Sequence, residues 1–391
     1  MSSPGRTRSD PAVSLLPSVP LQRRKPSLAD RYREVYPPAP STAPPVDEWS
    51  AALLRAIEAE TGTSVTFAEE PVALGHSEGP WAYRCRLAQA AMWRRASDAA
   101  PDAETGSGAS GGLDIRLAPD RASIEREAAV MRVARRELKG AAAVRAVVRL
   151  DAGPEPMWAL LRDEVGGVGL PELIGFNLHH SDTLLRGFAT HQADIHRMPV
   201  AELRDHGVPV IDAEEEVARI DAAHLPKQRR WLDEHLPTPA EAVLCHGGYQ
   251  PMSVYGPPPD VWDSHGGPGC GLVTTNWCAA VLAEREFDVA YTLVALWSAP
   301  FFAKNRPERT AIKMIRNTLI NTYKLGYEDA HPFDPDRVRF WEAFHVLRGI
   351  ARLQGVYDST GSPFAPPDRG MLPTELASEL PRRYQQLTRV R

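Results

Sequence analysis

The chain has 391 residues, of which 43% are hydrophobic and 24% are charged. This length is too great for one small domain and suits two lobes that share a cleft, and the composition is that of an ordinary globular protein. The net charge of −5 excludes a whole-chain attraction to nucleic acid or acidic membranes. The sequence contains no apolar run of about 18 residues and no signal-peptide core, so we expect a cytoplasmic protein without a membrane span.

Residues 1–48 form a distinct N-terminal segment with ten prolines and a basic cluster around Arg23, Arg24 and Lys25. Few large apolar residues occur there, so the segment cannot bury enough surface to offset its ordering entropy. We expect a disordered, solvated tail. Docking of a protein partner is the alternative function.

The first lobe is expected to span residues 49–165 and to contain a small antiparallel sheet. Apolar spacing predicts a helix from Val46 to Thr61, and short β-branched and aromatic runs predict strands on both sides of a glycine-containing turn at 75–80. A Gly/Ser/Ala stretch at 102–112 predicts a flexible connection. It precedes the segments expected to be a strand at 113–119, a helix at 123–132 with Ser123 as its N-cap, and strands at 144–150 and 157–162.

The second lobe is expected to span residues 166–391 and to be mainly helical. Apolar stripes predict helices at 184–199, at 213–236 with a break at Pro226, and in three segments after residue 288. His196 is interpreted as a packed, hydrogen-bonded residue. Two short strands, 243–245 and 271–275, each end in a polar cluster and flank a Pro- and Gly-rich insert at 256–269.

The segment 242–290 carries the chemistry-bearing motifs. It contains His246-Gly247, then Pro251, then Trp277 after a strand, and finally Glu286-Phe287-Asp288-Val289-Ala290. The order of these features resembles the aminoglycoside phosphotransferase and choline kinase-like family. The resemblance implies an α+β, two-lobed protein-kinase-like fold, with a small antiparallel-sheet N-lobe and a larger helical C-lobe.

In that family the catalytic loop reads His-Gly-Asp-x-x-x-x-Asn, and a later Ile-Asp-Trp supplies the main metal carboxylate. Here Gly248 stands at the catalytic Asp, Ser253 at the metal-binding Asn and Asn276 at the second Asp, although His246 and Trp277 match. Phosphoryl transfer needs a carboxylate that orients the nucleophile and a Mg²⁺ ion held by anionic ligands. No catalytic residue of the family is therefore intact, and we expect no protein-bound metal.

The resemblance also assigns the nucleotide contacts of the family, which uses ATP and Mg²⁺. Arg116 and Glu127 take the place of the basic residue that contacts the α/β-phosphates and the helix glutamate that holds it. Gly75 and Ser77 lie where the family covers the phosphates, although a plain β-hairpin turn fits the same residues. Residues 163–169 resemble the inter-lobe hinge whose backbone would meet an adenine, and a simple flexible connection is the alternative.

Three hypotheses for function follow. The first is a pseudokinase-like binding or scaffold protein, with a small molecule in the cleft and a partner on the tail or the 256–269 insert. The second is an active phosphotransferase that recruits a carboxylate from Asp260, Asp263 or Glu284. The third is nucleotide-independent acid/base chemistry by His246 or His265.

The four cysteines give little evidence for a metal. Cys245, Cys270 and Cys278 could be combined with His265 as a zinc set, but their spacing fits no familiar ligand pattern. Free thiols in a reducing compartment are the favoured interpretation.

Overall fold

A computed structural model describes residues 46–62, 64–74, 81–88, 112–138, 141–152, 155–298, 306–360 and 379–390. Residues 1–45 of the predicted tail lie outside the described residues. The same holds for Gly75 and Ser77 and for residues 102–111 of the predicted connection.

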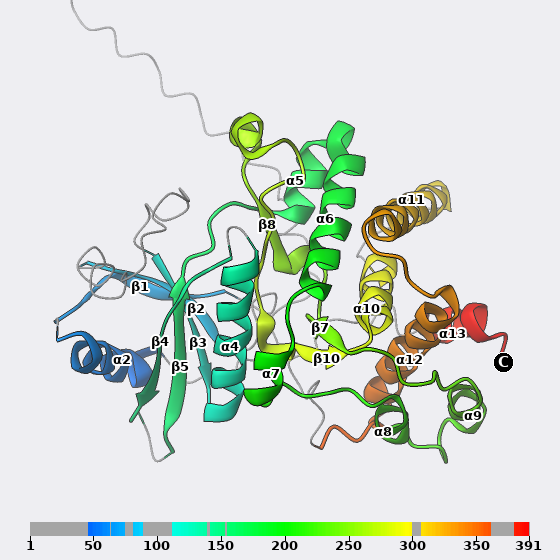
Figure 1. Ribbon diagram of the computed structural model, residues 1–391, viewed down its shortest axis with the longest axis horizontal. Helices are drawn as coiled ribbons and strands as arrows, with labels where there is room; N and C mark the ends of the chain where they lie inside the picture. The colour runs from blue at the N-terminus through cyan, green and yellow to red at the C-terminus, as the bar shows by residue number, and fades with distance from the viewer. Residues whose placement is uncertain are drawn as a thin grey trace, which may run out of the picture.

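The N-terminal lobe is a five-stranded antiparallel sheet, within the described residues, with one helix on each face (Figure 1). The strand order is β1-β2-β3-β5-β4. The elements in chain order are α2 (Val46–Thr61), β1 (Phe67–Ala73), β2 (Ala82–Leu87), β3 (Gly112–Ala118), α4 (Arg121–Glu137), β4 (Val144–Leu150) and β5 (Met157–Asp163). The helix predicted at 46–61 and the strand predicted at 144–150 have these same bounds, whereas the helix predicted at 123–132 forms only part of α4.

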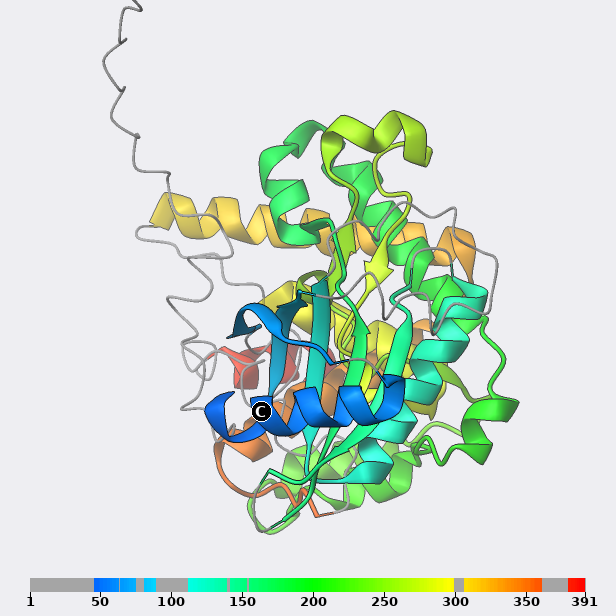
Figure 2. The ribbon, with the colours of Figure 1, turned by 90° about the vertical axis from the view of Figure 1, so that its left-hand side faces the viewer.

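The two faces of this sheet differ because side chains alternate along each strand. Leu113, Ile115 and Leu117 of β3 pack with Trp49 and Leu53 of α2 in one apolar cluster. Figure 2 shows α2 lying across that outer face. The alternate residues of β3 face inward, toward α4 and the second lobe.

Helix α4 begins at Arg121, and its N-cap is Asp120, so the prediction of Ser123 as N-cap is wrong. The Asp120 carboxylate accepts hydrogen bonds from the backbone N–H of Ala122 and Ser123, each at 3.0 Å. Ser123 Oγ instead donates to the Asp120 carbonyl. Two Asp oxygens satisfy two of the free amides of the first turn, which one hydroxyl cannot do.

The C-terminal lobe is mainly helical (Figure 1). The predicted helical region at 213–236 consists of two short helices, and Pro226 begins the second because proline has no N–H to lose there. The helices are α5 (Leu170–Phe176), α6 (Ser181–His196), α7 (Ala201–Asp205), α8 (Ala213–Ala218), α9 (Pro226–Glu234), α10 (Arg285–Ser298), α11 (Arg306–Ala330), α12 (Pro335–Leu353) and α13 (Leu380–Thr388).

Short strands and 3₁₀ turns, most of them between α9 and α10, build the site. Strand β7 pairs with β10, and β8 pairs with both β6 and β9. These elements are β6 (Val168–Gly169), η2 (Leu178–His180), β7 (Val243–Cys245), η3 (Pro251–Ser253), β8 (Val254–Gly256), η4 (Pro259–His265), β9 (Val273–Thr274), η5 (Trp277–Ala279) and β10 (Val281–Ala283). Their buried residues join those of α4, α6, α10 and α12 in the larger apolar core.

None of the helices in the described part of the chain combines the length and the apolar composition that a membrane crossing requires.

The cap of α4 can be tested directly. Asp120→Ala should lower the free energy of unfolding by about 1 kcal/mol, because it leaves two first-turn amides without an acceptor. Denaturant unfolding measures this change. Asp120→Asn, which keeps an acceptor oxygen, should recover most of the loss. A larger effect from Ser123→Ala than from Asp120→Ala would contradict the assignment.

Candidate functional site

Arg116 and Glu127, which the family resemblance assigns as a pair, lie together in the structure. Arg116 of β3 and Glu127 of α4 form an ion pair with Nε and Oε2 3.4 Å apart. The two side chains are only 10% and 4% exposed. Arg116 Nη1 is buried and has no hydrogen-bond partner in the described part of the chain. The pair therefore links the sheet to α4 and leaves one guanidinium nitrogen unused.

The loop after β7 begins with His246, which is fully buried. Its Nε2 bonds the carbonyl of Thr275 at 2.8 Å, and its ring lies 4.8 Å from that of Trp277. His246 therefore connects this loop to the segment that follows β9. This arrangement gives it a structural role and leaves its ring closed to solvent.

The two glycines after His246 differ in what they require. Gly247 has a φ of +74°, and a Cβ there would lie 1.9 Å from the carbonyl oxygen of Ala279. Gly248 is not in the left-handed region, and the atoms nearest to a Cβ there are His246 Nδ1 and Tyr291 Oη, both at 3.8 Å. The backbone therefore requires glycine at 247 but has ordinary room for a side chain at 248.

Ser253 is fully buried, and the loop itself uses its hydroxyl. Its Oγ donates to the carbonyl of Gln250 at 2.9 Å and accepts from the backbone N–H of the same residue at 3.3 Å. These bonds close the η3 turn as a capping box. The Ser253 hydroxyl is therefore not presented to the cleft as a ligand.

Asn276 lies in a left-handed conformation at the start of η5, with φ 61° and ψ 56°. Its Oδ1 accepts from the thiol of Cys278 at 3.0 Å. Trp277 is buried, and its Nε1 donates to the carbonyl of Thr274. This turn therefore offers an amide where the family resemblance places a carboxylate.

Asp288 of α10 is the buried acid that organises the loop. It is fully buried, and its carboxylate accepts from the backbone N–H of His246 at 3.2 Å and of Gly247 at 2.9 Å. It also accepts from Gln192 Nε2 at 2.9 Å and His196 Nε2 at 3.2 Å. The prediction that His196 is a packed, hydrogen-bonded residue is confirmed.

Burial alone raises the pKa of the Asp288 carboxyl. The hydrogen bond and charge of His196, the charge of His246 and the hydrogen bond of Gln192 outweigh burial and hold the pKa below its ordinary value of 3.8. The carboxylate is therefore ionised at neutral pH. It acts on the backbone of the loop.

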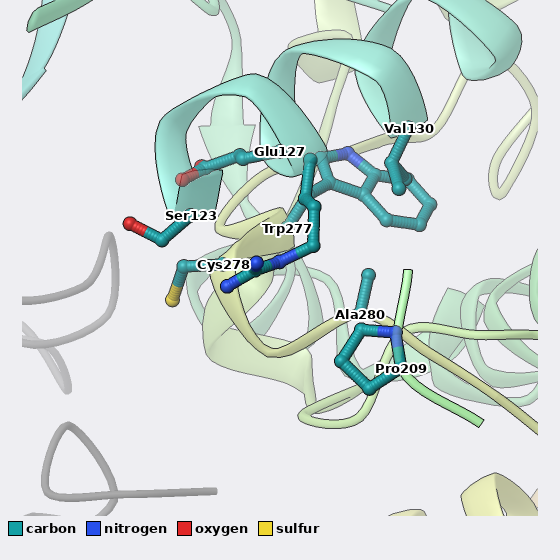
Figure 3. A pocket seen from close by; sticks show the side chains of 8 residues that line it. Ser123, Glu127, Val130, Pro209, Trp277, Cys278 and Ala280 are labelled. Carbon is teal, nitrogen blue, oxygen red and sulfur yellow. The ribbon is translucent and has the colours of Figure 1, made fainter. Parts of the chain in front are cut away.

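A small cavity of about 40 Å³ lies between α4 and the segment around η5. Figure 3 shows it, with Glu127 of α4 on one side and Trp277 and Cys278 of η5 on another. Small-molecule sites usually measure about 300 Å³ or more, whereas this volume suits one or a few water molecules. It is not a substrate site.

The acidic residues considered as replacements lie elsewhere. Asp260 and Asp263 are exposed on η4, which packs through Trp262 against His180 of η2, with ring centroids 5.2 Å apart. Glu284 is partly buried and bonds Arg337 and Trp341 of α12. The atoms nearest to a Cβ at Gly248 belong to His246 and Tyr291, so none of these three carboxylates lies against it. His265 is exposed on η4, and its Nδ1 lies 2.9 Å from the carbonyl of Val261.

The whole arrangement matches solved phosphotransferases in fold. A Ralstonia eutropha protein provisionally assigned as an aminoglycoside phosphotransferase superposes with a TM-score of 0.54 at 16% identity, over 87% of this chain and 98% of that one. The chain has the fold of the aminoglycoside phosphotransferases. Amicoumacin kinase hAmiN, in complex with AMP-PNP, Ca²⁺ and Ami, shares this phosphotransferase fold with a TM-score of 0.51 at 12% identity, over 87% of this chain and 91% of that one.

Sequence comparison adds nothing to this likeness, since no family model and no curated protein matches the chain.

The metal site of a working phosphotransferase does not fit these residues. Mg²⁺ needs near-octahedral oxygen ligands, usually with one or two carboxylates. Within the described residues, no group of three His, Cys, Asp or Glu side chains is placed to hold a metal. The hydroxyl of Ser253 is already used, and Asn276 brings only a neutral oxygen that already accepts a thiol.

Sequence reasoning noted Asp288 only as part of a helix-start motif and missed what it does. Asp288 follows the loop it binds by about forty residues, and its partners Gln192 and His196 lie on α6. An acid in the first turn of an otherwise apolar helix was the available signal, because an unpaired buried acid is costly.

Asp288→Asn should lower the free energy of unfolding by about 3 kcal/mol, because it removes a buried charge that accepts from two backbone amides and two side chains. Asp194→Asn is the matched control. It breaks a half-exposed pair with Arg197, and we expect a loss below about 1 kcal/mol. Equal effects of the two changes would contradict the role given to Asp288.

The difference in stability between wild type and Asp288→Asn should also depend on pH. Since folding lowers the pKa of Asp288, its stabilisation is fully present above its unfolded pKa and is lost as pH falls through the folded value. Unfolding of wild type and Asp288→Asn as a function of pH should therefore give curves that converge only in acid, below about pH 4.

The two loop glycines give a third prediction. Gly247→Ala should destabilise the chain by about 2 kcal/mol or more, because a left-handed backbone and a carbonyl clash combine. Gly248→Ala should change stability by less than about 1 kcal/mol, since its Cβ has room. Thermal unfolding of both variants checks the contrast, and equal losses would show that position 248 also requires glycine.

Proposed function

We propose that this chain is a non-catalytic, pseudokinase-like binding protein built on the phosphotransferase fold. The observation that carries this is the loop after β7, in which no carboxylate accompanies Gly248 and the hydroxyl of Ser253 closes its own turn. A loop in this state cannot orient an attacking hydroxyl. It can still form one wall of a ligand site.

The expected loss of activity is large. General acid–base assistance contributes about 10² to 10⁴ in rate. Loss of an electrostatic contact to the reacting group costs about 10² to 10³ more. Position 248 lacks the first group and position 276 lacks the metal carboxylate that would provide the second. Together these losses lower the rate of phosphoryl transfer by a factor of about 10⁴ to 10⁷.

An active phosphotransferase with a recruited acid has less support. Glu284 already bonds Arg337 and Trp341, and it sits 8% exposed. Asp260 and Asp263 are on the exposed η4 turn, which packs on η2. Acid/base chemistry by His246 is weakened by the burial of that ring and its bond to Thr275.

What the protein binds is a proposal as well. The pair of Arg116 and Glu127 keeps a buried guanidinium nitrogen without a partner in the described residues, which favours a small polar ligand between the lobes. The insert at 256–269 exposes Asp260, Asp263 and His265 and suits contact with a protein partner. The basic tail is the second candidate for that contact.

Turnover of ATP tests the proposal. The wild-type chain should release no ADP above background with ATP, Mg²⁺ and a panel of hydroxyl and amine acceptors, and Mg²⁺ should cause no ATP-dependent rise in melting temperature. Amicoumacin kinase in the same assay is the positive control. Turnover at about 1 s⁻¹ or faster, as in ordinary kinases, would refute the proposal.

A further inference from the structure

A cluster of charged side chains lies on the inner face of the N-terminal sheet, between the hinge and Arg116. Asp114 is two residues before Arg116 on β3 and therefore faces the same side. In the sheet register, Arg84 of β2 and Arg162 of β5 are the cross-strand neighbours of Asp114. These three residues, with Glu164 of the hinge, form what we call the wall cluster.

The wall cluster is closely bonded and mostly buried. Arg84 donates to Asp114 through Nε at 2.8 Å and Nη2 at 3.2 Å, and its Nη1 lies 3.2 Å from Glu164 Oε1. Arg162 Nη2 lies 3.7 Å from the second oxygen of Asp114. The side chains of Asp114 and Arg162 are 1% and 5% exposed, whereas Arg84 is 33% exposed.

The hinge amides are also used within the protein. The backbone N–H of Val165 donates to Asp114 Oδ2 at 3.4 Å, and that of Glu164 donates to the carbonyl of Gly112. The N–H of Asp163 donates to the carbonyl of Ala143, and the Asp163 carboxylate pairs with Arg145. Three successive hinge donors thus have partners before any ligand arrives.

A purine fits such a wall poorly. A heteroaromatic base is held by apolar faces above and below it and by a few hydrogen bonds at its edge. A base packed here would remove water from the charged side chains of Arg84 and Glu164. Because the base is uncharged, it would not compensate for the free-energy cost of that desolvation. The N–H donors of Arg84 are already paired with the carboxylates of Asp114 and Glu164, so they are not available to the edge of a base. The edge donor at Val165 is bonded to Asp114.

We infer that the wall cluster excludes purine bases from the inner face of the sheet beside residues 163–165, and that a ligand held near Arg116 is small, hydrophilic and without a nucleobase. This inference rests on the proposed function and deepens it, because a chain that merely lacks catalytic groups could still bind a nucleotide. Asp114 is the determining residue, since its carboxylate accepts from Arg84 and from the Val165 N–H and lies 3.7 Å from Arg162 Nη2.

Single substitutions in the wall cluster are poor tests because each leaves a buried charge without its counterion. Replacing a whole buried ion group with apolar side chains of similar size is often neutral for stability. The informative variant is therefore the triple change Arg84→Leu, Asp114→Ala and Arg162→Leu. It removes the charges together and frees the Val165 N–H.

The experiment measures adenosine binding by calorimetry, without metal and without phosphates. Wild type should show no heat of binding at millimolar adenosine, and the triple variant should bind at least about tenfold more tightly, a gain of about 1.4 kcal/mol. The matched control is Arg149→Leu with Asp151→Ala, which removes an exposed charge pair after the same sheet. The control should behave as wild type.

Two outcomes would overturn the inference. One is adenosine binding by wild type at micromolar concentration. The other is a triple variant that unfolds cooperatively yet gains no binding. Adenosine binding by wild type without ATP turnover overturns this inference alone, and ADP release in the turnover assay overturns the proposed function.

Discussion

The carboxylate of Asp288 is the interaction on which the site depends. It reaches from the first turn of α10 to the backbone N–H groups of His246 and Gly247, and it is held in turn by Gln192 and His196 of α6. Buried amides must be bonded, and a buried charge must be satisfied from several sides. The Asp288 carboxylate therefore holds the loop after β7, helix α10 and helix α6 together in a single arrangement.

Most of the fold was predictable because its signals are local. Apolar spacing gave the helix at Val46–Thr61 and the strand at Val144–Leu150 with their observed bounds. The cap of α4 was missed because Asp120 and Ser123 are both good caps, and only geometry decides which oxygen reaches the free amides. The absence of the family's acidic and amide residues from the loop at 246–253 was found through the resemblance. A glycine and a serine give no functional signal without a motif to compare them with.

The wall cluster could not be predicted from one sequence. Arg84, Asp114 and Arg162 are separated by 30 and 48 residues along the chain and meet only through the register of three strands. Register is set by burial of the opposite face, where Leu113 and Ile115 pack on α2. Each residue alone looks like a solvated charge at the edge of a strand. Their pairing is a property of the assembled sheet.

The left-handed turn at Asn276 has a consequence for the side chains that the main chain of the site can accept. Aspartate and asparagine tolerate this conformation better than most side chains do, and a Cβ at position 248 would be in ordinary van der Waals contact, 3.8 Å from its nearest neighbours. The backbone conformation at 276 is therefore one that aspartate also adopts, and a Cβ at 248 meets no clash. Placing carboxylates at these two positions would accordingly be a matter of side-chain substitution on the existing main chain.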